Sequence, residues 1–422
     1  MRGQVYLVSK LYALKGRVIT GTGADAIEKG LVVVEDNRIQ VVCQENEYQI
    51  PECAEVIEVK DGTIMPGFID AHEHIGMGSV RFHELYQIHP YEKVCKAVQE
   101  LGQLLDAGFT TVRDCGGVSV HLKTSAAKGY ITAPRLFCAG RVITQTNGHF
   151  DMIKSFPVEY NDKGNLLAFI ADGVTEVRKA ARTNFREGAD FVKMMLSAGV
   201  TSQSSRTNTQ EFSDEEIRAM VEEAEKYETY ASAHCISNRG LKAALRNGVT
   251  CIEHAYNIEP EDIEVMQKKV KWLVPTLSIL HVYYTNIKNQ TNLQYLSPWA
   301  IAKTPACYER QYKAIKMAID AGIKIGLGAD FGGDAVMGPH GLNGMEFERL
   351  VVAGMTPMQA IMAGTKNGSE IVMNPEIGTL EAGKLADVVV VQGNPLEEIS
   401  LLGDPKRVKV VMLDGRIVKS IA

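Results

Sequence analysis

Side chains that can bind a cation stand at or near the ends of several short apolar segments of this sequence. They are His72, His74, Lys193, His234, His254 and Asp330. Because His72 and His74 are two positions apart, both side chains would point to the same face of a strand. Two neutral imidazoles on one face can hold one metal ion. If the other segments end beside them, the six residues form one metal centre.

Lys193 lies in the apolar run Asp190-Phe191-Val192-Lys193-Met194-Met195-Leu196. A lysine ammonium is costly to bury there unless it is paired or neutralised. The structural alternative is a side chain that reaches solvent at the strand end, or one that pairs with Asp190. The functional alternative is a carbamate, formed by addition of CO₂ to the amine, whose two oxygens could bridge two cations.

His234, His254 and Asp330 each have an ordinary structural explanation when they are taken singly. The histidines could be buried with one backbone hydrogen bond, and Asp330 could cap a helix. Asp330 could also contact a metal and transfer a proton. The ligand interpretation is favoured because all three follow apolar runs in a chain that repeats such runs.

The middle of the chain alternates between helical patterns and short apolar runs rich in β-branched residues. We count eight runs, at 63–72, 110–115, 135–140, 190–195, 229–235, 250–255, 271–276 and 324–330. Helices are predicted from Ser213 toward Tyr227, from Gly240 to Arg246 and from Tyr308 to Asp320. This alternation predicts an α/β fold, a (β/α)₈ barrel with its active site at the carboxyl ends of the strands.

The two ends of the chain are β-rich, with hairpin signals at Asp36-Asn37 and Asp414-Gly415. Neither end has enough strands to close a sheet alone. We therefore expect one composite β domain from residues 1–62 and 371–422, and a barrel domain from residues 63–370. Residues 278–305 form a polar, aromatic insertion that could be a lid or a loop.

Together these features resemble those of the metal-dependent amidohydrolase superfamily over nearly the whole chain. The matching motifs are Pro66-Gly67-Phe68-Ile69-Asp70-Ala71-His72-Glu73-His74, Lys193, His234, His254, Asp330 and Ile377-Gly378-Thr379-Leu380-Glu381-Ala382-Gly383-Lys384-Leu385-Ala386-Asp387. Thr146-Asn147-Gly148-His149 and Gly338-Pro339-His340-Gly341 are similar to elements of the imidazolonepropionase-related, prolidase-like branch. The resemblance implies a distorted (β/α)₈ barrel and a small β-sandwich domain formed by both termini.

The resemblance also implies a binuclear metal centre. One divalent ion would be held by His72, His74 and Asp330, and the other by His234 and His254, with a carboxylated Lys193 and a hydroxide between them. Zinc is the default metal for such ligands, although manganese, iron and cobalt are compatible. Asp330 would pass a proton from the hydroxide to the departing amine, and His149 would donate to the oxyanion unless it is a solvated loop residue. His340 is also a candidate for substrate binding and would orient the loop after the eighth run.

The implied substrate is a dipeptide or an N-acyl amino acid that releases a C-terminal residue such as proline, arginine or lysine. Its carboxylate would need a polar partner, for which Tyr230, Arg239 and Arg141 are candidates. The chain has His234-Cys235-Ile236 where prolidase-like enzymes often have a polar side chain at the third position. A cyclic-amide hydrolase or deaminase is the second enzymatic alternative, and a scaffold without catalytic activity is the third.

Composition excludes several other classes of protein. The 422 residues include 45 basic and 51 acidic side chains, and a net charge of −6 argues against a nucleic-acid partner. No apolar run is long enough for a membrane span, and residues 1–15 lack a secretory signal. The eight cysteines contain no C-x-x-C pair and are expected to be reduced and mostly buried, so we expect a cytoplasmic enzyme. A homo-oligomer is the expected assembly.

Overall fold

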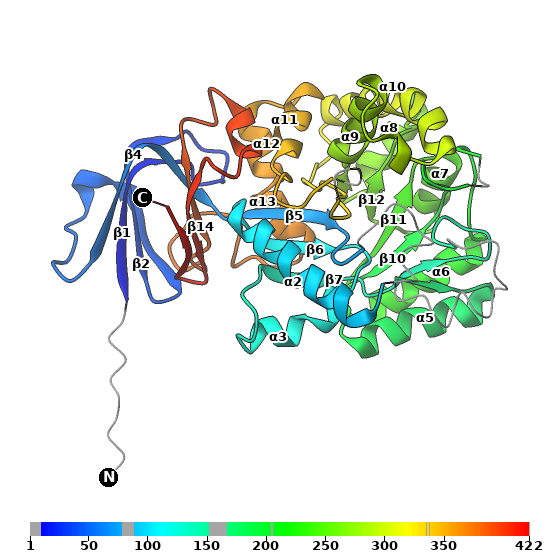
Figure 1. Ribbon diagram of the computed structural model, residues 1–422, viewed down its shortest axis with the longest axis horizontal. Coiled ribbons are helices and arrows are strands. Elements are labelled where there is room, and N and C mark those ends of the chain that lie inside the picture. The colour runs from blue at the N-terminus through cyan, green and yellow to red at the C-terminus, as the bar shows by residue number, and fades with distance from the viewer. Residues whose placement is uncertain are drawn as a thin grey trace, which may run out of the picture.

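A computed structural model describes residues 10–77, 88–151, 167–203, 206–334, 336 and 338–421 of the chain. These residues form an α/β fold with three hydrogen-bonded sheets (Figure 1). One sheet combines both ends of the chain, and the other two are parallel and carry the cation-binding candidates. No described helix has both the length and the apolar character that crossing a membrane requires.

The composite sheet has seven strands in the order β16-β15-β14-β4-β1-β2-β3. They are β1 (Leu11–Val18), β2 (Ile27–Glu35), β3 (Arg38–Gln44), β4 (Glu55–Pro66), β14 (Val388–Gln392), β15 (Val408–Leu413) and β16 (Arg416–Ser420). The predicted hairpins are confirmed, and their turns place Asp36, Asp414 and Gly415 at positive φ. β4 continues to Pro66 in this sheet, so the run predicted at 63–72 is shared between two sheets.

The two parallel sheets contain the strands of the middle of the chain. One has the order β5-β6-β7, from β5 (Phe68–Glu73), β6 (Phe109–Asp114) and β7 (Arg135–Cys138). The other has the order β13-β12-β11-β10-β8-β9, from β8 (Val142–Thr144), β9 (Ala168–Ile170), β10 (Val192–Met195), β11 (Ala231–Cys235), β12 (Cys251–His254) and β13 (Trp272–Val274). The sequence did not indicate β8 or β9, which are only three residues each.

Backbone hydrogen bonds link β7 to the residue before β10 and link β5 to the eighth run. The amide of Asp190, just before β10, donates to the carbonyl of Cys138 at 2.7 Å. The amide of Ala71 in β5 donates to the carbonyl of Leu327 at 2.8 Å. The eighth predicted run, 324–330, is not an assigned strand, and it pairs with β13 through a single bridge between Leu273 and Ile325.

Helices follow most of the parallel strands. They are α2 (Pro90–Asp106), α3 (Lys123–Ala127), α5 (Gly173–Glu187), α6 (Asp214–Lys226), α7 (Asn238–Arg246), α8 (Pro260–Lys269), α9 (Leu277–Lys288), α10 (Pro298–Asp320), α11 (Met345–Val352), α12 (Pro357–Ala363) and α13 (Lys366–Ile371). Ser213 caps α6 in a capping box, as predicted. The insertion at 278–305 is largely helical rather than a loop, because it supplies α9 and the beginning of α10.

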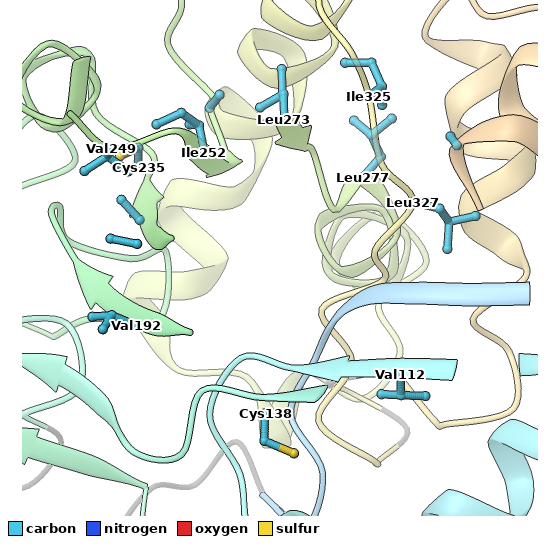
Figure 2. Packing of buried hydrophobic residues seen from close by; sticks show 14 of the residues in the cluster. Val112, Cys138, Val192, Cys235, Val249, Ile252, Leu273, Leu277, Ile325 and Leu327 are labelled. Carbon is cyan, nitrogen blue, oxygen red and sulfur yellow. The ribbon is translucent and has the colours of Figure 1, made fainter. Parts of the chain in front are cut away.

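The main core lies between the parallel strands and these helices, and Figure 2 shows part of it. Val112 of β6, Val192 of β10 and Ile252 of β12 belong to this one buried cluster. All eight cysteines are free thiols, and five are buried, but Cys53 and Cys95 are exposed. The buried apolar side chains hold the strand ends in place, and the polar residues discussed next lie at those ends.

Candidate active site

One cavity lies where the parallel strands end, and the residues with metal-binding side chains line it together. They are His72 and His74 from the end of β5, Lys193 from β10, His234 from β11, His254 from β12 and Asp330 from the end of the eighth run. The structure therefore brings together the six residues that the sequence suggested as metal ligands. His149, from the loop after β8, lines the same cavity.

Distances within this cluster are those of neighbouring ligands. The rings of His72 and His254 are 4.9 Å apart between centroids, and those of His234 and His254 are 4.4 Å apart. Oδ1 of Asp330 lies 3.1 Å from Nε2 of His74 and 3.4 Å from Nε2 of His72. One ligand atom from each of His72, His254 and Asp330 fits within 4.8 Å of the others.

Hydrogen bonds on the far side of the rings decide which nitrogen faces the cavity. Nδ1 of His74 lies 2.7 Å from the carbonyl oxygen of Gly116, which can only accept, so Nδ1 carries the proton. Nδ1 of His72 lies 2.7 Å from Oε2 of Glu253, which accepts in the same way. In the neutral rings both Nε2 atoms therefore present lone pairs to the Asp330 carboxylate.

Glu253 connects His72 to a fully buried polar network. Arg113 donates from Nη2 to Oε1 of Glu253 at 2.7 Å, and the Ser232 hydroxyl donates to the same oxygen. Arg113 also donates from Nη1 to the Tyr230 hydroxyl at 3.1 Å. Burial alone would raise the pKa of Glu253, but Arg113 and other neighbouring charges lower it well below its usual range, so the side chain is a carboxylate.

Lys193 and His234 have buried nitrogen atoms without hydrogen-bond partners among the described residues. The orphaned atoms are Nζ of Lys193, which is fully buried, and Nε2 of His234. Native proteins rarely leave such atoms unsatisfied, so each needs a ligand or another explanation. Both side chains line the cavity, where a metal ion or a carbamate would satisfy them.

Burial favours the neutral form of three histidines of the cluster, His72, His234 and His254. It lowers the pKa of His72 to about 4, with a further contribution from Lys193, and it lowers the pKa values of His234 and His254 well below their usual value. Burial would raise the pKa of Asp330, but the neighbouring histidines lower it below the usual range. Neutral imidazoles and an ionised carboxylate are the forms that bind a divalent metal.

Left-handed backbone conformations mark three of the strand ends. His254, Thr276 and Asp330 have φ values of 70°, 52° and 59°, although none is glycine. Such conformations cost free energy and persist where the surroundings impose them, often at functional sites. At Thr276 the hydroxyl lies 2.7 Å from Nδ1 of His254, so this residue helps to orient the His254 ring.

The rest of the cavity wall is apolar and aromatic. Its members include Phe150, Met195, Ile236, Tyr256, Ile279, Leu280 and Tyr283. The last three belong to α9, which the insertion at 278–305 provides. Bound substrate would therefore contact hydrocarbon and tyrosine rings beside the polar cluster.

Two of the residues suggested for substrate binding lie outside this cavity. Tyr230 immediately precedes β11, whereas His234 lies near its carboxyl end, so the Tyr230 hydroxyl meets Arg113 instead. Arg141 pairs with Glu187 at 3.1 Å, and its guanidinium lies 3.6 Å from the centre of the Phe169 ring. Neither side chain is part of the cavity lining.

The other two suggested residues are also elsewhere. Arg239 is exposed on α7. His340 is buried between two carboxylates, with Nδ1 3.1 Å from Oε2 of Glu73 and Nε2 3.6 Å from Oε2 of Glu100. Because neither lines the cavity, the described structure offers no cation other than Lys193 in its wall.

Glu253, Thr276 and the apolar wall were not predicted from the sequence. The sequence does carry a signal for Glu253, because it stands between Ile252 and His254 in an apolar run. A charged side chain buried there must be paired with another group. Thr276 has no sequence signal, because its role depends on how the loop after β13 turns back to His254.

The donor atoms fit a metal centre. The Nε2 atoms of His72 and His74 lie 3.4 and 3.1 Å from Oδ1 of Asp330. In the neutral rings, all three atoms carry lone pairs and none carries a proton. A cation placed among them would convert repulsion between acceptors into coordination. The buried nitrogens of Lys193 and His234, for which the described part of the chain offers no hydrogen-bond partner, extend this set of possible metal ligands from the neighbouring strands.

Comparison with known proteins shows that this chain is similar to amidohydrolases over nearly its whole length. Residues 63–418 match the Amidohydrolase family. Ochratoxinase of Aspergillus niger is 31% identical over 437 aligned residues, which cover 98% of this chain and 87% of that protein. Its crystal structure matches with a TM-score of 0.88 and 29% identity, covering 98% of this chain and 96% of that one.

Two further solved structures are similar over nearly the whole chain. A prolidase complexed with N-methylphosphonate-L-proline has 30% identity and a TM-score of 0.88, covering 98% of this chain and 100% of that one. A Xaa-Pro dipeptidase with bound methionine in its active site has 27% identity and a TM-score of 0.87, with the same coverage. On this evidence the chain belongs to the amidohydrolase family, whose hydrolases act on amide C–N bonds.

Proposed function

We propose that this protein hydrolyses the amide bond of a dipeptide or an N-acyl amino acid with the help of two divalent metal ions. The observation that carries the proposal is the convergence of His72, His74 and Asp330, whose acceptor atoms face one another at 3.1 to 3.4 Å. Bound metal would lower the pKa of a water molecule and polarise the substrate carbonyl. Zinc is the metal that we expect first.

The proposed ligand sets follow the positions of the side chains. His72, His74 and Asp330 would hold one ion, and His234 and His254 the other. Lys193 would contribute as a carbamate, formed when its amine adds to CO₂ and releases a proton. The buried position of Lys193 supports this modification, because the negative carbamate would be balanced by the two metal ions and would give the orphaned nitrogen a covalent partner.

Two side chains would carry out the proton transfers and charge stabilisation. Asp330 would accept the proton of the attacking water and then deliver it to the departing amine. The pKa of Asp330 lies below its usual range, so the carboxylate is ionised at neutral pH and can begin as a base. His149 would donate a hydrogen bond to the oxyanion that develops on the substrate carbonyl.

The substrate class is supported by the similar proteins and by the cavity wall. The prolidase and the Xaa-Pro dipeptidase act, by their names, on peptides with proline. In this chain Ile236, Ile279 and Tyr283 line the cavity, and they favour apolar groups on either side of the scissile amide. We therefore place substrates with apolar side chains ahead of those with C-terminal arginine or lysine.

The architecture proposed for this chemistry is a distorted (β/α)₈ barrel with a terminal β-sandwich. The hydrogen bonds from Asp190 to Cys138 and from Ala71 to Leu327 support closure of the two parallel sheets into one barrel. The seven-stranded composite sheet supports a terminal domain made from both ends of the chain. The division into residues 1–62 with 371–422, and 63–370, stays a prediction.

A substrate screen tests the proposal. Zinc-loaded protein would be assayed against dipeptides, N-acyl amino acids and cyclic amides, with the Asp330→Asn variant as the control. We expect release of a free amino acid from apolar dipeptides or N-acyl amino acids by the wild type alone. Activity on cyclic amides alone would favour the cyclic-amide hydrolase, and release of ammonia would favour a deaminase. No turnover and no stoichiometric metal would favour a scaffold.

A further inference from the structure

His149 rests in a cradle made by the turn that follows β10. Its Nδ1 lies 2.6 Å from the Ser202 hydroxyl. Its ring packs directly on Gly199, where an added Cβ would lie only 1.9 Å from Cε1 of His149. The turn therefore fixes both the plane of the ring and the direction of its two nitrogens.

The hydrogen bonds of Ser202 point to one tautomer of His149. The Ser202 Oγ already accepts a hydrogen bond from the Gly199 amide at 3.1 Å. It has one proton to give, and among the described residues the Nδ1 of His149 is the acceptor recorded for it. If Ser202 donates to Nδ1, the neutral ring holds its own proton on Nε2.

The position of His149 makes this proton useful. A neutral imidazole has one N–H, which is then the Nε2–H. His149 lines the cavity, and its ring centroid lies 4.5 Å from that of His234. An Nε2–H on this ring faces away from Ser202 and can donate to a group bound in the cavity.

Two side chains near the amino end of α10 donate hydrogen bonds to the turn that contacts His149. Trp299 donates from Nε1 to the carbonyl of Thr201 at 2.6 Å, and Lys303 donates from Nζ to the carbonyl of Ser202 at 2.7 Å. These two carbonyls are consecutive in the turn. Residues of the insertion at 278–305 therefore support the residue that contacts His149, in addition to lining the cavity through α9.

We propose that Ser202 is a positioning residue that holds His149 as the Nε2–H tautomer, with the hydrogen directed into the cavity, and that Trp299 and Lys303 keep Ser202 in place. The proposal rests on the proposed function for the role of that hydrogen, which is to meet the oxyanion of the tetrahedral intermediate. The tautomer itself is a property of the chain and can be measured without substrate.

The test is nitrogen NMR of the zinc-loaded protein labelled with ¹⁵N-histidine. The His149→Gln variant identifies the His149 signals by their loss. We expect a protonated Nε2 and an unprotonated, hydrogen-bonded Nδ1 in the wild type and in Ser202→Thr, which keeps the hydroxyl. In Ser202→Ala we expect a mixture of the two tautomers. A protonated Nδ1 in the wild type, or an unchanged tautomer in Ser202→Ala, would overturn the proposal.

Kinetics give a second readout on the same variants. With the amide substrate found in the screen, Ser202→Ala should lower kcat at least about tenfold, because a misdirected donor loses much of its effect. KM and metal content should stay within about twofold of wild type, and Ser202→Thr should recover most of kcat. An unchanged kcat in a variant with altered tautomers would contradict the role of the hydrogen. If the wild type hydrolyses no amide, the proposed function fails while the tautomer result stands.

Discussion

Nδ1 of His72 lies 2.7 Å from Oε2 of Glu253, and the exposed fractions of the two side chains are 1% and 0%. This contact ties a candidate metal ligand on β5 to a carboxylate on β12, 181 residues later in the chain. The other carboxylate oxygen of Glu253 accepts from Arg113. An imidazole held in this way presents Nε2 in one direction and is a stronger donor to a metal.

Replacement of Glu253 should weaken metal binding and the fold together. Glu253→Gln removes the charge that polarises His72 and leaves the buried Arg113 without its ionic partner. We expect metal affinity to fall about 10- to 100-fold and unfolding free energy to fall by about 3–5 kcal/mol. Competition with a chromophoric chelator and urea unfolding measure the two effects.

Glu187→Gln is the matched control for this substitution. It also removes the carboxylate of an arginine pair, but Glu187 meets Arg141 away from the cavity. Metal affinity should stay at the wild-type value in this variant. Equal metal affinity in Glu253→Gln and the wild type would show that Glu253 does not support the metal ligands.

Loss of the Lys193 side chain should empty much of the metal centre. In Lys193→Ala no carbamate can form, so most metal and activity should be lost while the fold persists. Short carboxylic acids could enter the vacated space and restore part of the turnover, whereas Lys123→Ala, which removes a lysine paired with Asp190 near the surface, should leave metal content unchanged. A Lys193→Ala variant with two metals and full turnover would show that this residue does not bridge them.

Asp330→Asn tests the proton transfer. The amide keeps the size of the side chain but cannot accept the proton of the attacking water. We expect kcat to fall about 10²- to 10⁴-fold, the usual range for a lost general acid–base group. Circular dichroism should be unchanged. A fall of less than about tenfold, well short of that range, would assign the proton transfer to another group.

Stability at acid pH should depend on Glu223 of α6. Arg182, Lys226 and Arg178 lower the pKa of this carboxylate to about 2, against a burial effect that raises it. A lowered folded-state pKa means that the stabilisation is complete above the unfolded pKa of about 4.5 and is lost as the pH falls toward 2.

Urea unfolding at several pH values measures this effect. Glu223→Gln should lower the urea midpoint at pH 7, and the difference from wild type should shrink between pH 4.5 and pH 2. Glu225→Gln, at an exposed position of the same helix, should have little effect at either pH. A difference that stays constant with pH would show that the charge of Glu223 does not stabilise the fold.

The polar residues that line the cavity could be predicted because each has a chemical type that is unusual at the end of an apolar strand. His72, Lys193, His234, His254 and Asp330 all meet this description, and the alternation of strands and helices predicts that such ends converge. The hairpins at Asp36 and Asp414 and the cap at Ser213 were predictable for the same reason, since local chemistry determines them.

The remaining features depend on tertiary structure that the sequence does not display. Ser202 meets His149 because a turn after β10 folds across the cavity, and no local pattern places the two residues together. Tyr230 was expected to bind a substrate carboxylate, but it lies at the amino end of β11. There its hydroxyl accepts a hydrogen bond from the buried Arg113. The polar and aromatic composition of residues 278–305 did not indicate helices. Tertiary packing of α9 against α10 and α11 accompanies the helical structure there.

Elemental analysis of the purified protein tests the central claim most directly. The protein would be stripped with a chelator, reloaded with zinc and desalted, together with a His72→Ala, His254→Ala double variant that has lost one ligand from each proposed set. We predict about two zinc ions per wild-type chain, and fewer than one in the variant. A wild-type chain that retains no zinc, or a double variant that retains as much as the wild type, would contradict the account.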